Sequence, residues 1–394
     1  MSFAFHKSGG RAFPAAAVLV LSALSGFFAR GQGRDPSFAV HAINPESEYS
    51  ACAVLDVDRD GRLDVVCGGF WYQAPSWKRY LVREVEKIRG RYDGYWHLPY
   101  DVDGDGWTDL INVNYRSESI FWVEHPGEAY DRPWKKHLVA RPGAMETGRL
   151  EDVDGDGELD LLPNGVKFAA WWEMEIEETE TGGQRRRFVR RDLPGEVAGH
   201  GVGFGDIDGD GRGDVVGRDG WLEAPVNRHA GEWTWHPEFE LDRDASIPIL
   251  VVDVDGDGDS DIVWGRGHNY GLFWLEQDRT AAEVWRRHVI DESWSQAHAL
   301  LWVDLDGDGG MELVSGKRYM AHEGRDPGAH DPMTACWYRF DPGTGSWRRH
   351  VIASGGQVGF GLDPKAVDLD ADGDLDLVVC GRSGLYWLEN LIGD

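Results

Sequence analysis

The sequence predicts an all-β fold, a seven-bladed β-propeller, and three observations support this prediction. First, one acidic phrase, Asp-x-Asp-x-Asp-Gly-x-x-Asp with a single change in one copy, recurs seven times along the 394 residues. Second, successive copies begin 45 to 64 residues apart, a period that suits a four-stranded blade, and the apolar period of helical repeats is absent. Third, 52 Gly, 19 Trp and a hydrophobic fraction of 41% favour short strands and tight turns around a large core.

Each repeat contains four strand-like runs. An apolar run leads into the acidic loop and a second one leaves it, as in 63–67 and 375–380. A third, aromatic run is seen at 120–123, 271–275 and 384–388, and a fourth at 134–139, 285–290 and 347–352. Four strands separated by turns are what one propeller blade requires.

The last repeat stops after its third run, which would leave an open sheet edge. The missing run is found at the other end of the chain, because Phe38–Ile43 (FAVHAI) resembles the fourth runs at 285–290 and 347–352 (both WRRHVI). We therefore expect the amino-terminal strand to complete the last blade. Residues 34–394 then form one propeller domain with adjacent termini.

Residues 1–33 are predicted to be a signal peptide and linker. Lys7 and Arg11 precede an apolar stretch from Ala12 to Ala29, which is the arrangement of an export signal. The alternative, an uncleaved membrane anchor, is disfavoured because the stretch is short for a span and contains Pro14. The protein is expected to be secreted or periplasmic.

The acidic loops are predicted to bind Ca²⁺, at up to seven sites, with Mg²⁺ as an alternative at some of them. Alternate carboxylates on a tight loop can converge on one ion, and Gly permits the sharp turn. The loop is shorter than an EF-hand loop and is flanked by strands. The predicted ligands are Asp56, Asp58, Asp60 and Asp64; Asp101, Asp103, Asp105 and Asp109; Asp152, Asp154, Asp156 and Asp160; Asp206, Asp208, Asp210 and Asp214; Asp253, Asp255, Asp257 and Asp261; Asp304, Asp306, Asp308 and Glu312; and Asp368, Asp370, Asp372 and Asp376.

Two of the loops deviate from the pattern. Glu312 replaces the last Asp of the sixth loop, and Ala371 replaces a common Gly in the seventh, so these two are expected to bind less tightly. Full occupancy by seven divalent ions would move the formal net charge from −29 to about −15. The acidity therefore argues against nucleic acid as a partner.

On these loops, the chain resembles the FG-GAP or VCBS repeat family, the calcium-loop propellers that include the integrin α head, over roughly residues 38–392. The resemblance implies the fold and the metal. It leaves the activity open, because the family includes adhesion modules, lectin-like proteins and the propeller parts of some enzymes.

Catalytic candidates are expected at the end of the central channel opposite the acidic loops. Residues about six positions before each first Asp should lie there, and these are Tyr95, Glu146, His200 and His298, with His97 close by. The end of the second run returns to the same face and carries predicted substrate-binding residues: Arg116, Lys167, Arg218, Arg266, His268, Lys317 and Arg382. Such groups would attract a carbohydrate or another small anionic ligand. The alternative is an ordinary polar, water-filled channel.

More weakly, the arrangement resembles the propeller portion of the aldos-2-ulose dehydratases, without the cupin-like sequence that accompanies it there. That resemblance implies proton abstraction beside a carbonyl, with His200 or His298 as the base, Glu146 as its partner or the acid, and Lys167 and Arg218 as charge stabilisers. Two functions follow: a carbohydrate lyase or dehydratase, or a non-enzymatic module that binds glycans or a protein partner. A monomer is expected in both cases.

Two further sets of residues are interpreted as structural. One Trp recurs near each third run, at Trp71, Trp122, Trp172, Trp221, Trp274, Trp337 and Trp387; wedge-filling between blades is favoured over a carbohydrate-stacking platform. The four cysteines, Cys52, Cys67, Cys336 and Cys380, lie in apolar runs and are expected to be buried thiols, although their pairing is not decided by the sequence.

Overall fold

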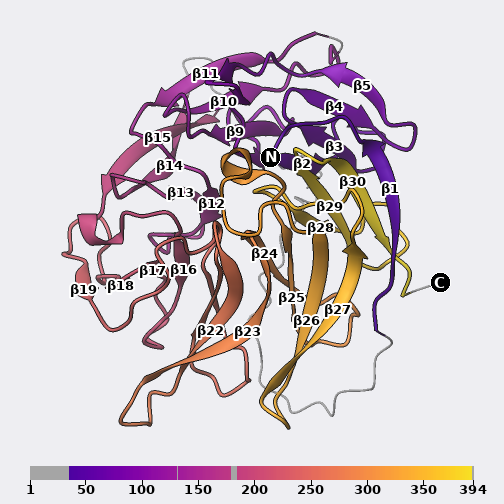
Figure 1. Ribbon diagram of the computed structural model, residues 1–394. Helices are drawn as coiled ribbons and strands as arrows, with labels where there is room; N and C mark the ends of the chain where they lie inside the picture. The colour runs from indigo at the N-terminus through magenta and orange to yellow at the C-terminus, as the bar shows by residue number, and fades with distance from the viewer. Residues whose placement is uncertain (1–34, 131, 179–183, 393–394) are drawn as a thin grey trace, which may run out of the picture.

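In the computed structural model, which describes residues 35–130, 132–178 and 184–392, seven four-stranded antiparallel sheets surround one axis (Figure 1). The predicted all-β, seven-bladed propeller is confirmed. The predicted signal peptide lies outside the described residues. Within the described ranges, no helix has the length and apolar character needed to cross a membrane.

The first four blades follow the chain in order, and each runs from the channel outward. Blade 1 has β2 (Cys52–Leu55), β3 (Asp64–Cys67), β4 (Phe70–Gln73) and β5 (Lys78–Leu81). Blade 2 has β8 (Trp96–Tyr100), β9 (Asp109–Val113), β10 (Ile120–Glu124) and β11 (Lys135–Ala140). Blade 3 has β12 (Gly148–Glu151), β13 (Asp160–Pro163), β14 (Ala170–Glu178) and β15 (Gln184–Asp192). Blade 4 has β16 (Gly203–Gly205), β17 (Asp214–Gly217), β18 (Gly220–Glu223) and β19 (Thr234–His236).

The remaining blades repeat the plan. Blade 5 has β20 (Leu250–Val252), β21 (Asp261–Gly265), β22 (Tyr270–Gln277) and β23 (Trp285–Ser295), and blade 6 has β24 (Ala297–Val303), β25 (Glu312–Lys317), β26 (Thr334–Asp341) and β27 (Ser346–Ser354). Blade 7 has β28 (Lys365–Val367), β29 (Asp376–Gly381), β30 (Gly384–Asn390) and β1 (Phe38–Asn44). The fourth strand of blade 7 thus comes from the amino-terminal part of the chain, with Phe38 opposite Asn390 and His41 opposite Trp387.

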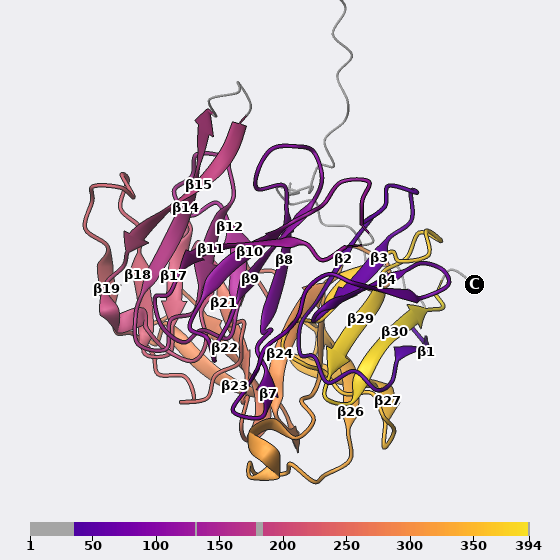
Figure 2. The same ribbon diagram turned by 90° about the horizontal axis from the view of Figure 1, so that it is seen from above.

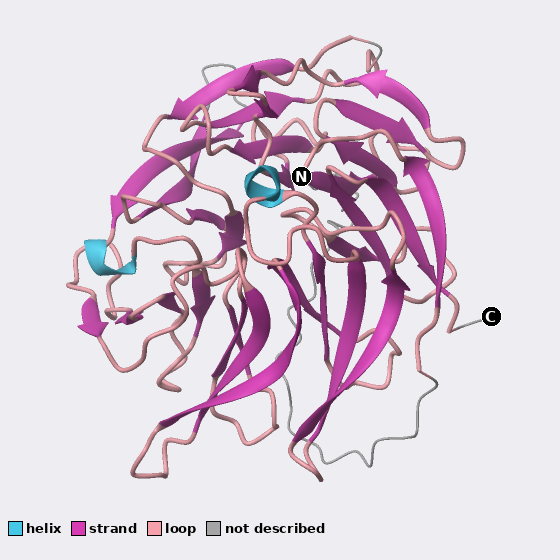
Figure 3. Ribbon diagram, viewed as in Figure 1, coloured by secondary structure: helices cyan, strands magenta, loops and turns pink. Residues whose placement is uncertain are grey.

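Helix is confined to two short 3₁₀ turns in the described part of the chain, η1 (Gly195–Val197) and η2 (Ala321–Gly324). Figure 3 shows η2 over the centre of the ring, and Figure 2 shows that it lies at one face. A small two-stranded sheet, β6 (Lys87–Ile88) with β7 (Arg91–Tyr92), precedes blade 2. The loop between β25 and β26 therefore covers one end of the channel.

The recurring tryptophans fill the space between neighbouring blades, as expected. Trp71 packs in one apolar cluster with residues of both blade 1 and blade 2, and Trp71, Trp171 and Trp337 are at most 1% exposed. In blade 3 the residue at the recurring position is Trp171 and not Trp172. Trp122 lies opposite Ile111, the third residue of β9, whereas Trp172 lies opposite Leu161, the second residue of β13. Trp171, one residue earlier in β14, is therefore the equivalent of Trp122. Burial argues against a carbohydrate-stacking platform at Trp71, Trp171, Trp221, Trp274 and Trp337, whereas Trp122 and Trp387 are half-buried and stack on His137 and His41.

The four cysteines are free and buried, which confirms the expectation of buried thiols. Cys52 lies opposite Cys67 in blade 1, and both pack with Cys380 of blade 7. These thiols fill the junction between the first and last blades.

The last carboxylate of each acidic loop ties three strands together. In blade 2, Asp109 is 1% exposed, and its two oxygens accept N–H bonds from Val102 at 2.9 Å and His125 at 2.8 Å. The same pair of backbone bonds recurs at Asp64, Asp160, Asp214, Asp261 and Asp376. In blade 6, Glu312 accepts one bond from the backbone of Leu305 and the other from the side chain of Arg339. Each loop is thereby fixed between the first strand and the end of the third.

The loop conformation makes the seventh copy strained. Ala371 has φ of 66°, in the left-handed region that penalises residues with a Cβ. Five other loops carry glycine at the same place, at Gly104, Gly155, Gly209, Gly256 and Gly307. Ala371 therefore makes the conformation of the seventh loop less favourable than that of the loops with glycine at this position.

Ala371→Gly is expected to raise the free energy of unfolding by about 1 kcal/mol, because it removes the strain at positive φ. Chemical denaturation followed by tryptophan fluorescence measures the change. The matched control is Ala282→Gly at an exposed residue without positive φ, which is expected to be neutral or destabilising. Equal effects of the two variants would contradict this account.

Candidate functional site

The candidate site lies at the channel end opposite the acidic loops. Glu146 and His200 lie two and three residues before the first residues of β12 and β16, the first strands of blades 3 and 4, and His298 is the second residue of β24. His268 lies between β21 and β22, in a connection that returns to the same end. The prediction that Glu146, His200 and His298 share one end of the channel therefore agrees with the structure.

Three imidazoles converge at this end. The Nε2 atoms of His200 and His268 are 3.1 Å apart, and ring nitrogens of His200, His268 and His298 all lie within 4.8 Å of one another. The ring centroids are 5.0 to 5.2 Å apart with interplanar angles of 61° to 78°. The rings thus meet at their edges and enclose a common point.

Hydrogen bonds determine which ring nitrogen carries the hydrogen in two of these histidines. Nδ1 of His200 lies 2.6 Å from the carbonyl oxygen of Ala245, and Nδ1 of His268 lies 3.1 Å from a carboxylate oxygen of Asp326. Both partners only accept, so each Nδ1 carries the hydrogen. In the neutral rings, both Nε2 atoms therefore present lone pairs.

A buried charged pair lies beside the histidines. One oxygen of Glu146 is 3.6 Å from Nε2 of His298 and 3.6 Å from the guanidinium of Arg318. Burial opposes ionisation of Glu146, but the charge of Arg318, with the nearby histidines, outweighs it and holds the pKa below its usual value. Glu146 is therefore a carboxylate at neutral pH.

The histidines next to this pair are poor proton carriers. Burial, reinforced by Arg318, lowers the pKa of His298 well below its ordinary value. Burial, followed by His200 and His322, lowers the pKa of His268 to about 4. Both rings are neutral at physiological pH, so neither is a ready acid.

A pocket of about 550 Å³ opens over the cluster. Its lining includes Tyr115, Glu146, His200, Arg243, Arg266, His268 and His322. The volume is within the range of small-ligand sites, and the charged groups at its base suit a polar ligand.

The predicted basic residues do not form a free ring around this pocket. Of the six, Arg266 lines it, and its Nε lies 3.0 Å from Asp244 and 3.4 Å from Asp242. Arg218 pairs with Asp219, and Lys167 is exposed. The partners of Arg266 come from the β19–β20 connection, which spacing along the chain could not reveal, whereas the partner of Arg218 is the next residue in the chain.

The other three are used within the scaffold. Lys317 is fully buried, and its Nζ donates to Ser295 at 2.8 Å and to the carbonyl of Gly328. Arg382 donates to the carbonyl of Met320 at 2.9 Å and to Glu323. Arg116 donates to the hydroxyl of Tyr95 at 3.3 Å. They hold the loops that shape the mouth.

The remaining predicted catalytic residues, Tyr95 and His97, lie outside the histidine cluster. Tyr95 is buried next to Glu146, and burial and then that carboxylate raise its pKa. His97 is 1% exposed and lies beside Asn112 and Asp363; burial, with Arg83 and Lys365, lowers its pKa to about 3. His97 is therefore a sealed, neutral residue and not a proton-transfer group of the mouth.

Arg318, His322 and Asp326 belong to the site but were not predicted. All three lie on the long β25–β26 connection, where Asp326 accepts from His268 and His322. Arg318 directly follows the predicted Lys317, and side chains alternate along an extended chain. That alternation was the available signal, because the residue that reaches Glu146 is the neighbour of the one chosen.

The acidic loops bring carboxylates together as cation sites require. Oxygens of Asp56, Asp58 and Asp64, and likewise those of Asp101, Asp103 and Asp109, lie within 4.8 Å of one another. Burial, despite two backbone hydrogen bonds and with smaller contributions from Asp103 and Asp101, raises the pKa of Asp109 to about 7. The first, third and ninth positions fit a hard cation. Carboxylates of the loop also accept backbone N–H bonds, Asp101 from Gly104 at 2.8 Å and Asp105 from Trp107 at 2.7 Å.

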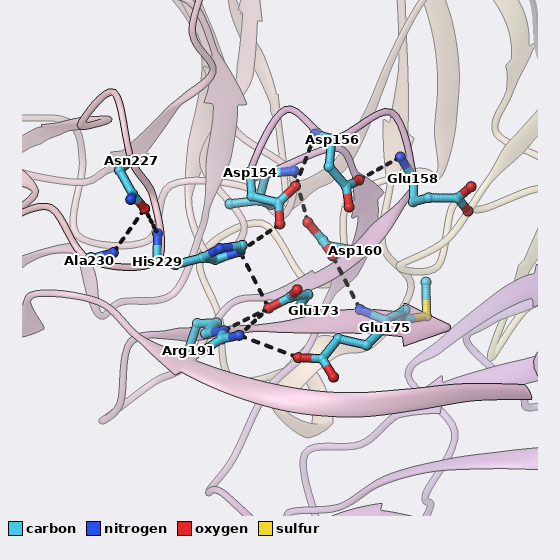
Figure 4. A network of polar contacts seen from close by, with 12 residues as sticks. Asp154, Asp156, Glu158, Asp160, Glu173, Glu175, Arg191, Asn227, His229 and Ala230 are labelled. Atoms are coloured by element: carbon cyan, nitrogen blue, oxygen red, sulfur yellow. Dashed lines mark hydrogen bonds and ion pairs between the residues drawn. The ribbon is translucent and has the colours of Figure 1, made fainter. Parts of the chain in front are cut away.

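Side chains from other segments contact several of the loops, as Gln73 does at Asp58 in blade 1. In blade 6, Arg339 contacts both Asp306 and Glu312, so a guanidinium already supplies positive charge there. In blade 3, Nε2 of His229 lies 2.8 Å from Asp154 and 3.4 Å from Glu173 (Figure 4). The seven loops are therefore not equivalent.

Comparison with known proteins supports the repeat assignment. The model of the FG-GAP-like repeat matches residues 101–162 and 253–315, which confirms the predicted FG-GAP repeats in these segments. No curated protein matches the sequence.

Solved structures with a similar arrangement include two kinds of protein. One is an Agrocybe aegerita lectin that specifically recognises non-reducing terminal N-acetylglucosamine, with a TM-score of 0.46, 15% identity, and coverage of 89% of this chain and 92% of the lectin. The others are the exotype rhamnogalacturonan lyase YesX, with a TM-score of 0.47 and 14% identity, and the rhamnogalacturonan lyase YesW, with 0.44 and 14%. Each lyase match covers 90% of this chain and 74% of the other.

Glu146→Gln is expected to lower the free energy of unfolding by about 3 kcal/mol, because it leaves the buried charge of Arg318 without its partner. Urea denaturation measures the loss. Glu196→Gln, at an exposed residue, is the control and is expected to change stability by less than about 0.5 kcal/mol. A similar small change in both variants would show that the pair carries no net electrostatic energy.

Proposed function

We propose that this protein is a calcium-stabilised, exported β-propeller that eliminates a leaving group from an oxidised or acidic carbohydrate at the channel mouth. The observation that carries the proposal is the buried Glu146 carboxylate held between Arg318 and His298 at the base of a pocket. Buried titratable groups with displaced pKa values at a pocket are typical of catalytic sites. Export is inferred from the sequence of residues 1–33.

The chemistry assigns different roles from those expected from the sequence. Elimination beside a carbonyl or carboxylate breaks a C–H bond, forms an enolate, and then breaks the C–O bond of the leaving group. Glu146 is the proton acceptor, because one of its oxygens, Oε2, is buried and has no hydrogen-bond partner among the described residues. His298 is less suited because burial lowers the pKa of its ring well below the usual value, so the ring holds an abstracted proton poorly.

Positive charge at the base of the pocket would stabilise the enolate. Arg318 is buried against the same oxygen of Glu146, so its guanidinium lies behind the carboxylate that lines the pocket and would stabilise negative charge that develops on a substrate there. His322 lines the pocket and is placed to give a proton to the departing oxygen. Glu146 then holds the abstracted proton and His322 has lost one, and proton exchange with solvent restores both groups.

Calcium is proposed as the structural ion. The carboxylates of a loop repel one another without a cation, and an ion bound only by the folded loops stabilises the fold by linkage. Burial raises the pKa of Asp109, and a bound cation would favour its charged form.

Removing calcium with a chelator is expected to lower the melting temperature by on the order of 10 °C or more, since each site saturated at 100 times its Kd contributes about 2.7 kcal/mol. Differential scanning calorimetry with and without added Ca²⁺ measures the shift. An unchanged melting curve in excess chelator would refute calcium stabilisation and leave the mouth chemistry untouched.

Turnover can be followed through the ultraviolet absorbance of an unsaturated product formed from a panel of uronic-acid oligosaccharides and oxidised sugars. We expect Glu146→Gln to reduce kcat by about 10²- to 10⁴-fold at a temperature where the variant is folded, with Glu196→Gln unchanged. Binding of a glycan without turnover, equal in the wild type and in Glu146→Gln, would instead support the non-enzymatic binding module.

A further inference from the structure

A second pocket, the arginine pocket, lies beside the pocket over the histidines, at the same end of the channel. The charged residues among the described ones that line it are four cations and one acid: Lys87, Arg91, Arg318, Arg382 and Glu48. The whole chain carries 69 acidic and 40 basic residues, so the arginine pocket has the opposite charge balance. A local excess of cations favours an anionic ligand.

Two of the four cations have partners that belong to the pocket walls. Lys87 lies 3.5 Å from Glu48, and both side chains are about half exposed. Arg318 is buried and lies 3.6 Å from Glu146, which lines the neighbouring pocket. Arg318 therefore separates the two pockets and brings the arginine pocket next to the proposed proton acceptor.

The other two cations, Arg91 and Arg382, hold a single carboxylate between them. Nε and a terminal nitrogen of Arg91 each lie 2.7 Å from Oε1 of Glu323, and Nη1 of Arg382 lies 3.3 Å from Oε2. Arg91 is on β7, Arg382 follows β29, and Glu323 is in η2; Figure 2 shows β7 next to η2 at this face. Three distant parts of the chain thus build a carboxylate-binding arrangement.

Glu323 makes these contacts from an unfavourable backbone conformation. The φ angle is 51° at Met320, 47° at His322 and 59° at Glu323, all in the left-handed region that penalises residues with a Cβ. Such strain persists only where surrounding contacts impose it. Arg382 supplies a further contact, because its Nη1 donates to the carbonyl of Met320 at 2.9 Å. A ligand that took over the arginines would therefore release a strained turn.

The same turn limits the size of the arginine pocket. With η2 in this position the cavity measures about 40 Å³, which holds a few waters but not a sugar ring. Arg318, Tyr319 and Ala321, at the start of the turn, form part of its wall. Movement of the turn would widen the cavity and free both arginines at once.

We propose that Arg91 and Arg382 form a binding site for a carboxylate of an acidic oligosaccharide, and that the side chain of Glu323 competes with the ligand for this site. Guanidinium groups recognise carboxylates through paired, charge-assisted N–H bonds, and both arginines already bind the carboxylate of Glu323. A ligand anchored here places its neighbouring sugar unit toward Glu146. The choice of ligand rests on the proposed function, whereas binding itself requires no turnover.

The test measures equilibrium binding of a uronic-acid oligosaccharide by isothermal titration calorimetry, in the full chain with Glu146→Gln so that no product forms. Adding Glu323→Gln is expected to raise the affinity by about 10-fold, because the competing carboxylate is removed. Arg91→Gln and Arg382→Gln are each expected to lower it by about 10- to 100-fold, because a hydrogen bond between charged groups is lost. Arg348→Gln, at an exposed residue of β27, is the control and should leave the affinity unchanged.

The sign of the Glu323→Gln effect separates competition from a purely structural role. If Glu323 only held the turn, this variant would bind the oligosaccharide equally or more weakly, and the proposal would be overturned. It would also be overturned by arginine variants that are folded by circular dichroism and bind as tightly as their parent, or by equal binding of an uncharged oligosaccharide of the same length. Binding with the expected pattern but no turnover in the wild type would contradict the elimination and leave this site intact.

Discussion

The propeller depends on one buried carboxylate in each blade. In blade 2, Asp109 accepts backbone N–H bonds from the residue that enters the loop and from the residue that ends the third strand. Burying a carboxylate is unfavourable unless it is hydrogen-bonded. With both backbone hydrogen bonds made, this group joins three strands, and without them its burial would destabilise the blade. Because six blades repeat the arrangement and blade 6 has Glu312 with Arg339 in its place, the strands at the acidic end are fixed by a buried carboxylate in every blade.

Rigidity at that end leaves the opposite end free to vary. The connections there differ in length and composition, and the one between β25 and β26 crosses the channel with η2. Met320, His322 and Glu323 all have positive φ, and strained backbone of this kind is concentrated at functional sites. The strained turn brings Asp326 to His268, so the least regular segment of the ring orders the side chains of its pocket.

Much of the architecture could be predicted from the sequence, because strand order and loop position follow from a repeated local pattern. The same logic placed Glu146, His200 and His298, which lie at a fixed offset from the loops. It failed where contacts come from other connections: Arg266 has acidic partners on the β19–β20 connection, and Lys317 donates to Ser295 and Gly328 while its neighbour Arg318 reaches Glu146. The choice of Trp172 over Trp171 was wrong because periodicity does not resolve a shift of one residue in register.

The pairing of β1 with β30 has a consequence for how the ring is completed. His41 and Glu389 are in contact although 348 residues separate them, so the last blade has its outer strand only after almost the whole chain is available. Contacts of such long sequence separation form late and slowly. Once formed, the pairing of β1 with β30 closes the ring. Local fraying elsewhere leaves the ring closed, whereas detachment of the seven-residue strand β1 exposes the edge of blade 7 and allows the neighbouring blades to separate. Mechanical and proteolytic resistance of the molecule should therefore be decided at this one junction.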